Sequence, residues 1–400
     1  MTKTVADAAE SLELRDLLAW FVREKQWINE RHLELCRIAA PTFFERTRSE
    51  WMQARFAEFG YDARLDRAGN VVAMLPGVEY GTVVTVTAHL DTVMAPRNPE
   101  QDVTFGPDGR FHGPGVSDNG SGLAALLAVA KAVASITPGA FRRLVFVANV
   151  GEEGEGNLSG MRYLCRQSPL AARLASLLVL DGPATDHITC QALASRRFDI
   201  TVSGPGGHSW SDYGIGNPVH ALSRAITLFT DTQLNGSGRP RSSFNFGIVE
   251  GGLSVNSIPT SARTKLDIRS ESIARLEELS AGLSGCVEKA IEVENDRSSG
   301  GRVSARITDI GTRPGGRLAE DAAILSILRA VDAHLAIRAQ VDCASTDANI
   351  PLSMGIPAVS IGAGGQGGGA HTPGEWYNPE GRDLGLRRIV LALYLLLREL

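Results

Sequence analysis

Four short apolar runs constrain the fold of this chain more than any other feature. They are "TVVTVTAHL" (82–90), "RRLVFVANV" (142–150), "SLLVLD" (176–181) and "IPAVSIGAG" (356–364). Each is rich in β-branched residues and nearly continuously apolar, which is typical of parallel strands buried on both faces. Helical stretches such as "GLAALLAVAKAVASI" lie between them. This alternation predicts an α/β fold with a mostly parallel sheet covered by helices.

The middle of the chain follows a different pattern. Between about 195 and 310 the periodicity indicates a strand, a helix, two strands, a long amphipathic helix and a final strand. This β-α-β-β-α-β order is that of the ferredoxin-like unit. We therefore predict that residues 195–309 form an inserted ferredoxin-like domain, and that 1–194 and 310–400 together form the α/β domain. The segment 12–60 and the run "IVLALYLLL" are predicted to be helical.

Composition excludes several classes of function. The 400 residues carry a net charge of −5, with an isoelectric point near 6.0, so no basic surface for nucleic acid is expected. The N-terminus lacks a signal-peptide pattern, and "IVLALYLLL" is about half the length that spans a bilayer. The five cysteines are scattered and form no CxxC motif, a reduced pattern. We expect a cytoplasmic protein that binds neither nucleic acid nor membrane.

Side chains able to bind metal recur where the predicted strands end. In open α/β sheets the ligand crevice lies outside the carboxyl ends of the strands, so these side chains are expected to converge. Taken singly, an acidic pair can be a solvated turn, an aspartate before a helix can be an N-cap, and a loop histidine can be structural. Their coincidence favours a metal site. The residues are His89, Asp91, Asp118, Glu152, Glu153, Asp181 and His371. His32, His112, His187, His220 and His334 are predicted to be structural or on the surface.

The donor set indicates the metal and its number. Imidazole and carboxylate donors without sulfur suit Zn²⁺, with Mn²⁺ or Co²⁺ as alternatives. Two histidines and several carboxylates exceed the three protein ligands that one catalytic zinc usually takes, so they fit two ions about 3.5–4 Å apart with one bridging carboxylate. His89 and Asp91 share one strand face. Asp91 is therefore expected to accept the second imidazole N–H and fix its tautomer.

These motifs resemble a known family. "TAHLDTV", "GPGVSDNGSG", "GEEGEG", "LVLDGP" and "HTPGEW" are similar to the successive motifs of the dinuclear zinc exopeptidases and deacylases, which include peptidase T, the glutamate carboxypeptidases, acetylornithine deacetylase and the aminoacylases. The resemblance runs from "APTFFE" near residue 41 to the C-terminus. It implies the following roles: His89, Asp118 and Asp181 hold one metal; Asp118, Glu153 and His371 hold the other; Glu152 is the general base acting on the metal-bridging water.

The resemblance has further implications. It implies a cis peptide between Asp118 and Asn119. In the inserted domain it implies that His208 and Asn256 polarise the scissile carbonyl, partly across a homodimer interface, and that Arg269 binds a substrate carboxylate. Donors aimed at a developing oxyanion stabilise the transition state, and a guanidinium matches a carboxylate in shape. A strand-face salt bridge is the alternative for Arg269.

Competing functions are less well supported by the sequence. "GAGGQG" (362–367) matches G-x-G-x-x-G, but "GGAHTPGEWYNP" after it is no helix start, and no G-x-S-x-G motif occurs. Within the family, an aspartate at position 181 resembles the aminopeptidases and dipeptidases, whereas a glutamate there resembles the carboxypeptidases and deacylases, and the segment "STDANIP" resembles peptidase T. Both features favour a short peptide as substrate, cleaved in the manner of an aminopeptidase, dipeptidase or tripeptidase. A deacylase or carboxypeptidase acting on N-acyl amino acids is the alternative. A non-catalytic peptide-binding homologue is expected to lack the base or a ligand, and this chain has all of them.

Overall fold

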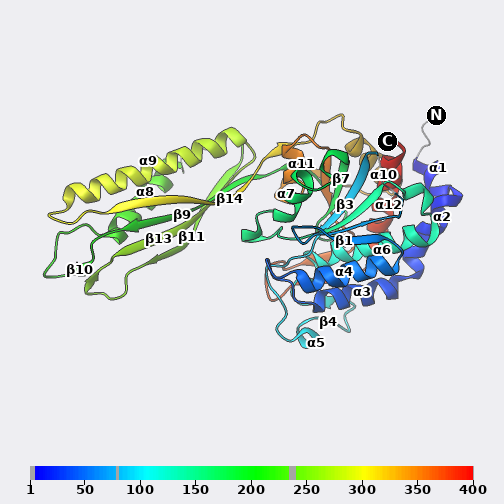
Figure 1. Ribbon diagram of the computed structural model, residues 1–400, viewed down its shortest axis with the longest axis horizontal. Coiled ribbons are helices and arrows are strands. Elements are labelled where there is room, and N and C mark those ends of the chain that lie inside the picture. The colour runs from blue at the N-terminus through cyan, green and yellow to red at the C-terminus, as the bar shows by residue number, and fades with distance from the viewer. Residues whose placement is uncertain (1–4, 78–80, 234–239, 400) are drawn as a thin grey trace. The chain divides into compact units, whose positions relative to one another are not determined.

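The computed structural model describes residues 5–77, 81–233 and 240–399. The chain divides into two compact units (Figure 1). Unit 1 consists of Met1–Ala192 and Gly316–Leu400, and unit 2 of Leu193–Gly315. The predicted inserted segment, 195–309, ends inside the last strand of unit 2, which spans Ser304–Arg313. This strand continues to Arg313 because Arg313 still pairs with Ser195 of the neighbouring strand.

Unit 1 contains a nine-stranded sheet in the order β1-β2-β6-β3-β7-β17-β8-β15, with β16 paired to β8. The four predicted strands form its centre as β3 (Val83–His89), β6 (Leu144–Asn149), β7 (Leu174–Leu180) and β17 (Ala358–Ile361). β3 runs parallel to β6 and β7, and β17 runs parallel to β7, which confirms the predicted parallel core. The other strands are β1 (Asp62–Leu65), β2 (Val71–Met74), β8 (His187–Ala192), β15 (Gly316–Arg317) and β16 (Gln340–Ala344).

Helices cover this sheet. All seven residues of β3 are buried, and α6 (Gly120–Ile136) and α12 (Arg382–Glu399) both pack against β3. The predicted helical segment forms α2 (Leu12–Arg23), α3 (Lys25–Arg37) and α4 (Arg46–Glu58), with the "APTFFE" loop between the last two. The remaining helical segments of unit 1 are α1 (Val5–Glu10), α5 (Pro99–Asp102), η1 (Gly139–Phe141), η2 (Gly154–Gly156), α7 (Ser159–Arg166), η3 (Ala171–Arg173), α10 (Ala323–His334) and α11 (Asn349–Ser353). Within the described ranges, no helix is both long and apolar enough to cross a membrane.

A small second sheet in unit 1 joins distant parts of the chain. Its order is β18-β19-β5-β4, with β4 (Thr104–Phe105), β5 (Phe111–His112), β18 (Gln366–Gly368) and β19 (Trp376–Asn378). Tyr377 of β19 pairs with Phe111 of β5 in the ladder. This pairing holds the late "HTPGEW" segment beside the segment that leads into the "GPGVSDNGSG" turn. No helix follows the glycines of "GAGGQG"; they continue into β18.

Unit 2 has its own antiparallel sheet and core. The order is β11-β13-β9-β14, formed by β9 (Ala194–Ser203), β11 (Ser242–Gly251), β13 (Ser261–Ser270) and β14 (Ser304–Arg313). The helices α8 (Pro218–Gln233) and α9 (Ile273–Arg297) pack against β9 and β13 around buried side chains such as Phe229 and Leu266. A two-stranded ribbon of β10 (Gly207–His208) and β12 (Ser257–Ile258) completes the unit. The predicted ferredoxin-like arrangement is confirmed.

Candidate metal centre

The ends of the parallel strands bring most of the predicted ligands to one edge of the sheet. His89 is the last residue of β3, Asp181 directly follows β7, and Glu152 and Glu153 lie three and four positions beyond the end of β6. Parallel strands end at the same edge, so side chains far apart in sequence meet there. His371 reaches the group from the connection between β18 and β19.

Asp118 lies at the centre of the cluster and contacts both histidines. Its Oδ1 is 3.1 Å from Nε2 of His89, and its Oδ2 is 3.1 Å from Nε2 of His371. Each carboxylate oxygen therefore faces a different imidazole. This is the arrangement expected of a carboxylate that bridges two ions.

The other two carboxylates divide between the same two histidines. Oδ1 of Asp181 is 3.9 Å from Nε2 of His89, and Oε1 of Glu153 is 2.9 Å from Nε2 of His371. One ligand atom each from His89, Asp118 and Glu153 lie within 4.8 Å of one another. The five predicted ligands thus form one contiguous group in the order Asp181, His89, Asp118, His371, Glu153.

Burial and mutual charge shift the pKa values of this group strongly. Burial, followed by the charge of Glu152, raises the pKa of Glu153 to about 7. Burial and the charge of Asp118 raise the pKa of Asp181 well above its usual range. Hydrogen bonding to Asp118 raises the pKa of His371 to about 9. Without a cation, these carboxylates compete for the positive charge of the two imidazoles.

The donors fit a pair of zinc-type ions. They are imidazole nitrogens and carboxylate oxygens without sulfur, the set that suits Zn²⁺, Mn²⁺ or Co²⁺. Nδ1 of His89 lies 2.9 Å from the main-chain oxygen of Asp91 and donates to it, which leaves Nε2 as the nitrogen facing the carboxylates. Cations would also relieve the repulsion of Asp118 with the carboxylates of Asp181 and Glu153.

Asp91 positions the glutamate pair through the main chain. Its Oδ1 accepts the N–H of Glu152, and its Oδ2 accepts the N–H of Glu153, both at 2.9 Å. The hydroxyl of Thr42, in the "APTFFE" loop, donates to Oδ2 at 3.0 Å. The imidazole of His89 is bonded to the carbonyl of Asp91, and the carboxylate oxygen is more distant at 3.6 Å. Asp91 therefore fixes the imidazole mainly through its backbone, while its carboxylate holds the glutamate loop.

The two glutamates are adjacent in sequence and similar in burial. Their exposures are 5% for Glu152 and 7% for Glu153. Glu153 lies against the ligand group, with Oε1 at 2.9 Å from Nε2 of His371.

Glu375 is a functional residue that the sequence analysis missed. Its Oε2 accepts the N–H of Gly115 at 2.8 Å, and its Oε1 accepts those of Ser117 and Asp118 at 2.8 Å each. The carboxylate thus holds the loop that presents Asp118. The sequence feature that could have identified Glu375 is its position in "HTPGEW", four residues after His371.

The peptide between Asp118 and Asn119 is cis, as the resemblance implied. The side chain of Asn119 connects this turn to the end of β7. Its Nδ2 donates to the carbonyl of Leu180 at 2.8 Å, and its Oδ1 accepts the N–H groups of Gly122 and Gly182 at 3.1 Å. Asp118 and Asp181 are thereby held by one amide side chain between them.

Asp347, in "STDANIP", is a second residue whose role was missed. It is fully buried, and its Oδ2 accepts a hydrogen bond from Nδ2 of Asn149, the last residue of β6, at 2.6 Å. Burial, followed by the charge of Glu152, raises the pKa of Asp347 to about 7. Its Oδ1 and the Oδ1 of Asn149 are buried without a hydrogen-bond partner in the described structure. A protonated carboxyl at Asp347 suits this setting, because it can donate where a carboxylate cannot.

The predicted substrate-binding residues all lie in unit 2. His208 is on β10, and Asn256 precedes β12; the carbonyl of Asn256 accepts the N–H of Ser209 at 3.0 Å, so the two lie together. Arg269 lies near the C-terminal end of β13, eight residues after Ser261, the first residue of that strand. At about 3.3 Å per residue, the two positions are about 26 Å apart along the strand. Its Nε donates to Asp267 at 2.7 Å, the strand-face salt bridge that was the alternative.

Comparisons with known proteins agree with this arrangement. The sequence profile of peptidase family M20/M25/M40 matches residues 85–395. A probable carboxypeptidase of Aspergillus clavatus is 26% identical over 202 residues, covering 46% of this chain and 44% of that protein. The chain therefore matches less than half the length of this curated relative.

Solved structures share the fold over nearly the whole chain. A tripeptidase from Staphylococcus aureus superposes with a TM-score of 0.76 at 20% identity, covering 93% of this chain and 98% of that one. The Bacillus subtilis protein YXEP, described as a dinuclear metal-binding peptidase from the M20 family, gives a TM-score of 0.67 at 14% identity, covering 96% and 99%. Because the family profile spans more than three quarters of the sequence, the chain belongs to peptidase family M20/M25/M40.

Proposed function

We propose that this protein is a dinuclear zinc hydrolase that cleaves an amide bond in a short peptide. The observation that carries the proposal is the central position of Asp118, whose two oxygens face His89 and His371 at 3.1 Å each. One ion would be held by His89, Asp118 and Asp181, and the other by Asp118, Glu153 and His371. When bound, the two ions would lower the pKa of a water between them and polarise the scissile carbonyl.

Glu152 would act as the general base. Its main-chain N–H is fixed by Asp91, and its side chain is nearly buried next to Glu153, which belongs to the ligand group. Its carboxylate would accept the proton of the attacking water and return it to the leaving amine. Asp91 would hold both glutamates in position, Glu152 as the base and Glu153 as a metal ligand.

Three features support a short peptide as substrate. A cavity of about 630 Å³ adjoins Asp181, and its lining residues include Thr189, Arg338, Ser345, Thr346 and Ser360. This volume fits a small molecule, because typical ligand pockets measure about 300–1,000 Å³. The aspartate at 181 resembles the aminopeptidase and dipeptidase members of the family, and the segment "STDANIP" resembles peptidase T. N-acyl amino acids, the substrates of a deacylase or carboxypeptidase, remain the second candidate, and the relative from Aspergillus clavatus is described as a probable carboxypeptidase.

Unit 2 would complete the site in a homodimer. Large apolar side chains lie almost fully exposed near the β10–β12 ribbon, which also carries His208 and Asn256. They are Trp210, Tyr213, Leu253 and Val255, with exposures of 87% to 103%. Contiguous exposed apolar surface marks interaction sites. A second copy covering it would place His208 and Asn256 where they can act on the partner's substrate, while Arg269 would bind a substrate carboxylate.

The five free cysteines, three of them buried, support the reducing cytoplasm as its compartment.

The central test is Glu152→Gln on purified protein. Metal analysis should find close to two zinc-type ions per chain in both wild type and variant, because Glu152 is not a proposed ligand. Peptide hydrolysis should fall about 100- to 10,000-fold in the variant, as expected when a general base is lost. Glu155→Gln, an exposed glutamate in the same "GEEGEG" loop, is the matched control and should keep full activity. Full activity of Glu152→Gln would exclude the assigned base.

A substrate panel separates the two candidates. Dipeptides, tripeptides and N-acetyl amino acids should be compared by kcat/KM with zinc-loaded enzyme. We expect the unblocked peptides to be cleaved fastest. Faster cleavage of N-acetyl amino acids would favour the deacylase.

Light scattering tests the dimer. Wild type should be dimeric, and the double variant Leu253→Asp, Val255→Asp should be monomeric and less active.

A further inference from the structure

The loop that follows β6 and carries the two glutamates is held by side-chain oxygens at four consecutive peptide groups. Each of the four N–H groups donates to a side chain from another part of unit 1, at distances from 2.9 to 3.2 Å. In chain order the bonds run from Val150 to Asn70, from Gly151 to Glu45, and from Glu152 and Glu153 to Asp91. Segments distant in sequence therefore set the course of this loop.

Glu45 is an acceptor in this set whose role has not been described above. It is the last residue of the "APTFFE" loop and is 6% exposed. Its Oε1 accepts the N–H of Gly151 at 3.2 Å, across 106 positions of sequence. Thr42, three residues earlier in the same loop, donates to the carboxylate of Asp91. One short segment thus contacts both the residue that holds the glutamates and the peptide that leads into them.

Neither a helix cap nor a salt bridge accounts for the Glu45 carboxylate. Glu45 directly precedes α4, where a side-chain oxygen often accepts an N–H of the first turn, but its side chain makes no such bond. No ion pair of Glu45 is found in the parts of the chain that the structure describes. Burial raises the pKa of Glu45, and the charge of Asp91 raises it further, while backbone N–H groups including that of Gly151 oppose this. The contacts that stabilise this carboxylate are therefore backbone N–H groups.

Gly151 is the residue at which the chain turns from β6 toward the glutamate pair. Its φ is +67°, in the left-handed region that glycine adopts without strain. A Cβ at this position would overlap Oγ of Ser159, so a side chain is excluded here. Because a glycine peptide has many accessible directions, the bond to Glu45 selects the one that leads into Glu152.

We propose that Glu45 is a positioning residue for Glu152, which it orients by accepting the N–H of Gly151. The inference rests on the role of general base proposed above for Glu152. Asp91 fixes the N–H of Glu152 and Glu45 fixes the preceding one, so the two bonds together set the direction in which the chain enters the base.

The position of this contact predicts which step it affects. A displacement of about 1 Å of a reacting group can cost about 100-fold in rate. Asp91 bonds the N–H groups of both glutamates, whereas Glu45 bonds the peptide before Glu152, two residues away from the proposed ligand Glu153. Loss of the Glu45 contact should therefore lower turnover more than metal binding.

The test compares Glu45→Met with Glu45→Gln on the zinc-loaded full chain. Both variants keep an unbranched side chain of similar length and both remove the charge, but only glutamine keeps an oxygen that accepts the N–H of Gly151. For a cleaved peptide we expect kcat of Glu45→Met to fall about 10- to 100-fold, with KM and zinc content near those of wild type. Glu45→Gln should keep kcat within about threefold of wild type, because the acceptor is retained.

Hydrogen exchange followed by mass spectrometry tests the contact without any activity. The fragment that contains Gly151 should exchange faster in Glu45→Met than in wild type, and at the wild-type rate in Glu45→Gln, because an N–H without its acceptor opens more readily. Full activity of Glu152→Gln together with faster exchange in Glu45→Met would refute the base and leave the loop contact standing. An inactive Glu152→Gln with unchanged kcat in Glu45→Met would refute the role of Glu45 alone.

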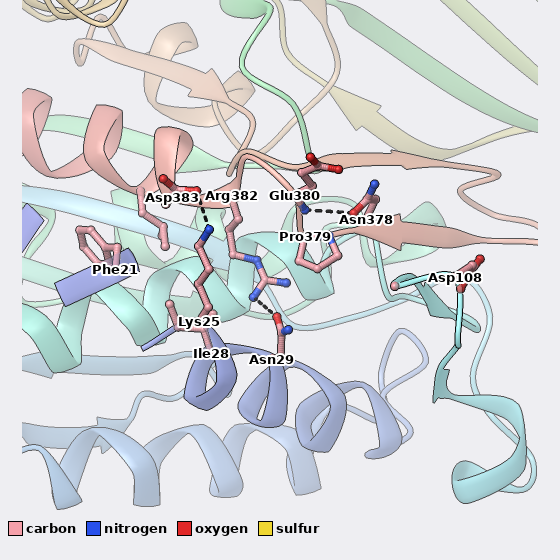
Figure 2. A pocket seen from close by; sticks show the side chains of 12 residues that line it. Phe21, Lys25, Ile28, Asn29, Asp108, Asn378, Pro379, Glu380, Arg382 and Asp383 are labelled. Atoms are coloured by element: carbon pink, nitrogen blue, oxygen red, sulfur yellow. Dashed lines mark hydrogen bonds and ion pairs between the residues drawn. The ribbon is translucent and has the colours of Figure 1, made fainter. Parts of the chain in front are cut away.

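Two exposed glutamates provide matched controls. Glu50→Met lies on α4, the helix that Glu45 precedes, and Glu380→Met lies far along the chain. Glu380 is on the rim of a cavity between α3 and the start of α12, and the lining of this cavity includes no residue of the glutamate loop (Figure 2). Both controls should match wild type in kcat and in exchange.

Three results would overturn the proposal. An equal fall of kcat in Glu45→Met and Glu45→Gln, with a shifted acid limb of the pH profile, would show that Glu45 acts through its charge. A lower melting temperature of Glu45→Met with wild-type kcat would show a purely structural role. Loss of zinc in parallel with loss of activity would place the effect on the ligand Glu153 and not on the base.

Discussion

Glu375 holds Asp118 in place through the main chain: its Oε1 accepts the N–H of Asp118 at 2.8 Å, across 257 positions of sequence. The same carboxylate also bonds the N–H groups of Gly115 and Ser117. Asp118, which faces both histidines, is thus held through its main chain by the side chain of Glu375. Replacing a residue that orients metal ligands in this way commonly weakens metal affinity or activity.

Glu375→Gln is therefore expected to weaken zinc binding about 10- to 100-fold. Glutamine offers one acceptor oxygen where the carboxylate offers two, so at least one buried N–H loses its partner at a cost of about 1–3 kcal/mol. Competition with a chromogenic chelator measures the affinity. Glu380→Gln, an exposed change on the same segment, should leave it unaltered. Unchanged zinc affinity in Glu375→Gln would show that the loop is held by other contacts.

Removal of metal is expected to lower the stability of the protein. Ions that bind only the folded state stabilise it by about 2.7 kcal/mol for each site when the free metal is a hundredfold above its Kd. Thermal unfolding with and without a chelator measures the change. His371→Ala should lose part of the gain, because it removes a ligand of one proposed ion, whereas Glu152→Gln should retain it. An identical melting temperature with and without metal would argue against the site.

Asp347 gives a pH-dependent contribution to stability. Its pKa is raised to about 7 in the folded protein from a usual value of 3.8, first by burial. The folded state then holds a proton that the unfolded state releases, so this contribution is complete below about pH 3.8 and is lost as the pH rises to about 7. The slope approaches about 1.4 kcal/mol per pH unit.

Asp347→Asn should remove that slope. We expect the metal-free variant to become progressively more stable relative to wild type between pH 5 and pH 7.5, measured by urea unfolding. Asp342→Asn, at an exposed position five residues earlier, is the control. A constant difference between Asp347→Asn and wild type over this range would mean that Asp347 is charged throughout.

The contribution of His32 to stability depends on pH in the opposite direction. Burial, followed by the charge of Arg382, lowers its pKa well below 6.5. Arg382 donates to Nδ1, and Nε2 lies 2.8 Å from the carbonyl of Val116, so the neutral imidazole is a donor there. The unfolded state takes up a proton that the folded state refuses, so this contribution is complete above pH 6.5 and is lost as the pH falls below it.

His32→Gln should therefore lose less stability than wild type between pH 7 and pH 5. The difference is expected to change by up to about 1.4 kcal/mol per pH unit. Parallel urea titrations of the two proteins measure it, and His334→Gln, at an exposed histidine, provides the control. Equal slopes for wild type and His32→Gln would mean that the buried imidazole accepts a proton in the folded protein.

The strands and helices were predictable because they depend on local patterns. The runs that form β3, β6, β7 and β17 are continuously apolar, and such a pattern is compatible with few environments other than a doubly covered sheet. Because parallel strands end at one edge of their sheet, this pattern also predicts that His89, Glu153 and Asp181 lie together. The resemblance to a metallopeptidase family supplied the division of ligands between two ions, which spacing alone left open.

Roles that depend on burial were not predictable in the same way. Glu375 and Asp347 are carboxylates in loops, and a sequence pattern cannot distinguish a solvated one from one that is enclosed by backbone N–H groups. The acceptor for His89 was expected to be the Asp91 side chain, whereas the carbonyl of the same residue is closer, because the carboxylate is bonded to the glutamate loop.

The sequence by itself determined the secondary structure, the α/β class and the types of donor available to a metal. Only the tertiary structure decided which donors meet. Asp118 lies between His89 and His371, Glu375 bonds the loop of Asp118, and Glu45 bonds the loop of Glu152. The physical reason is range: helix and strand periodicity is set by near neighbours, whereas charge pairing and burial depend on segments hundreds of residues apart that meet only when the core is packed.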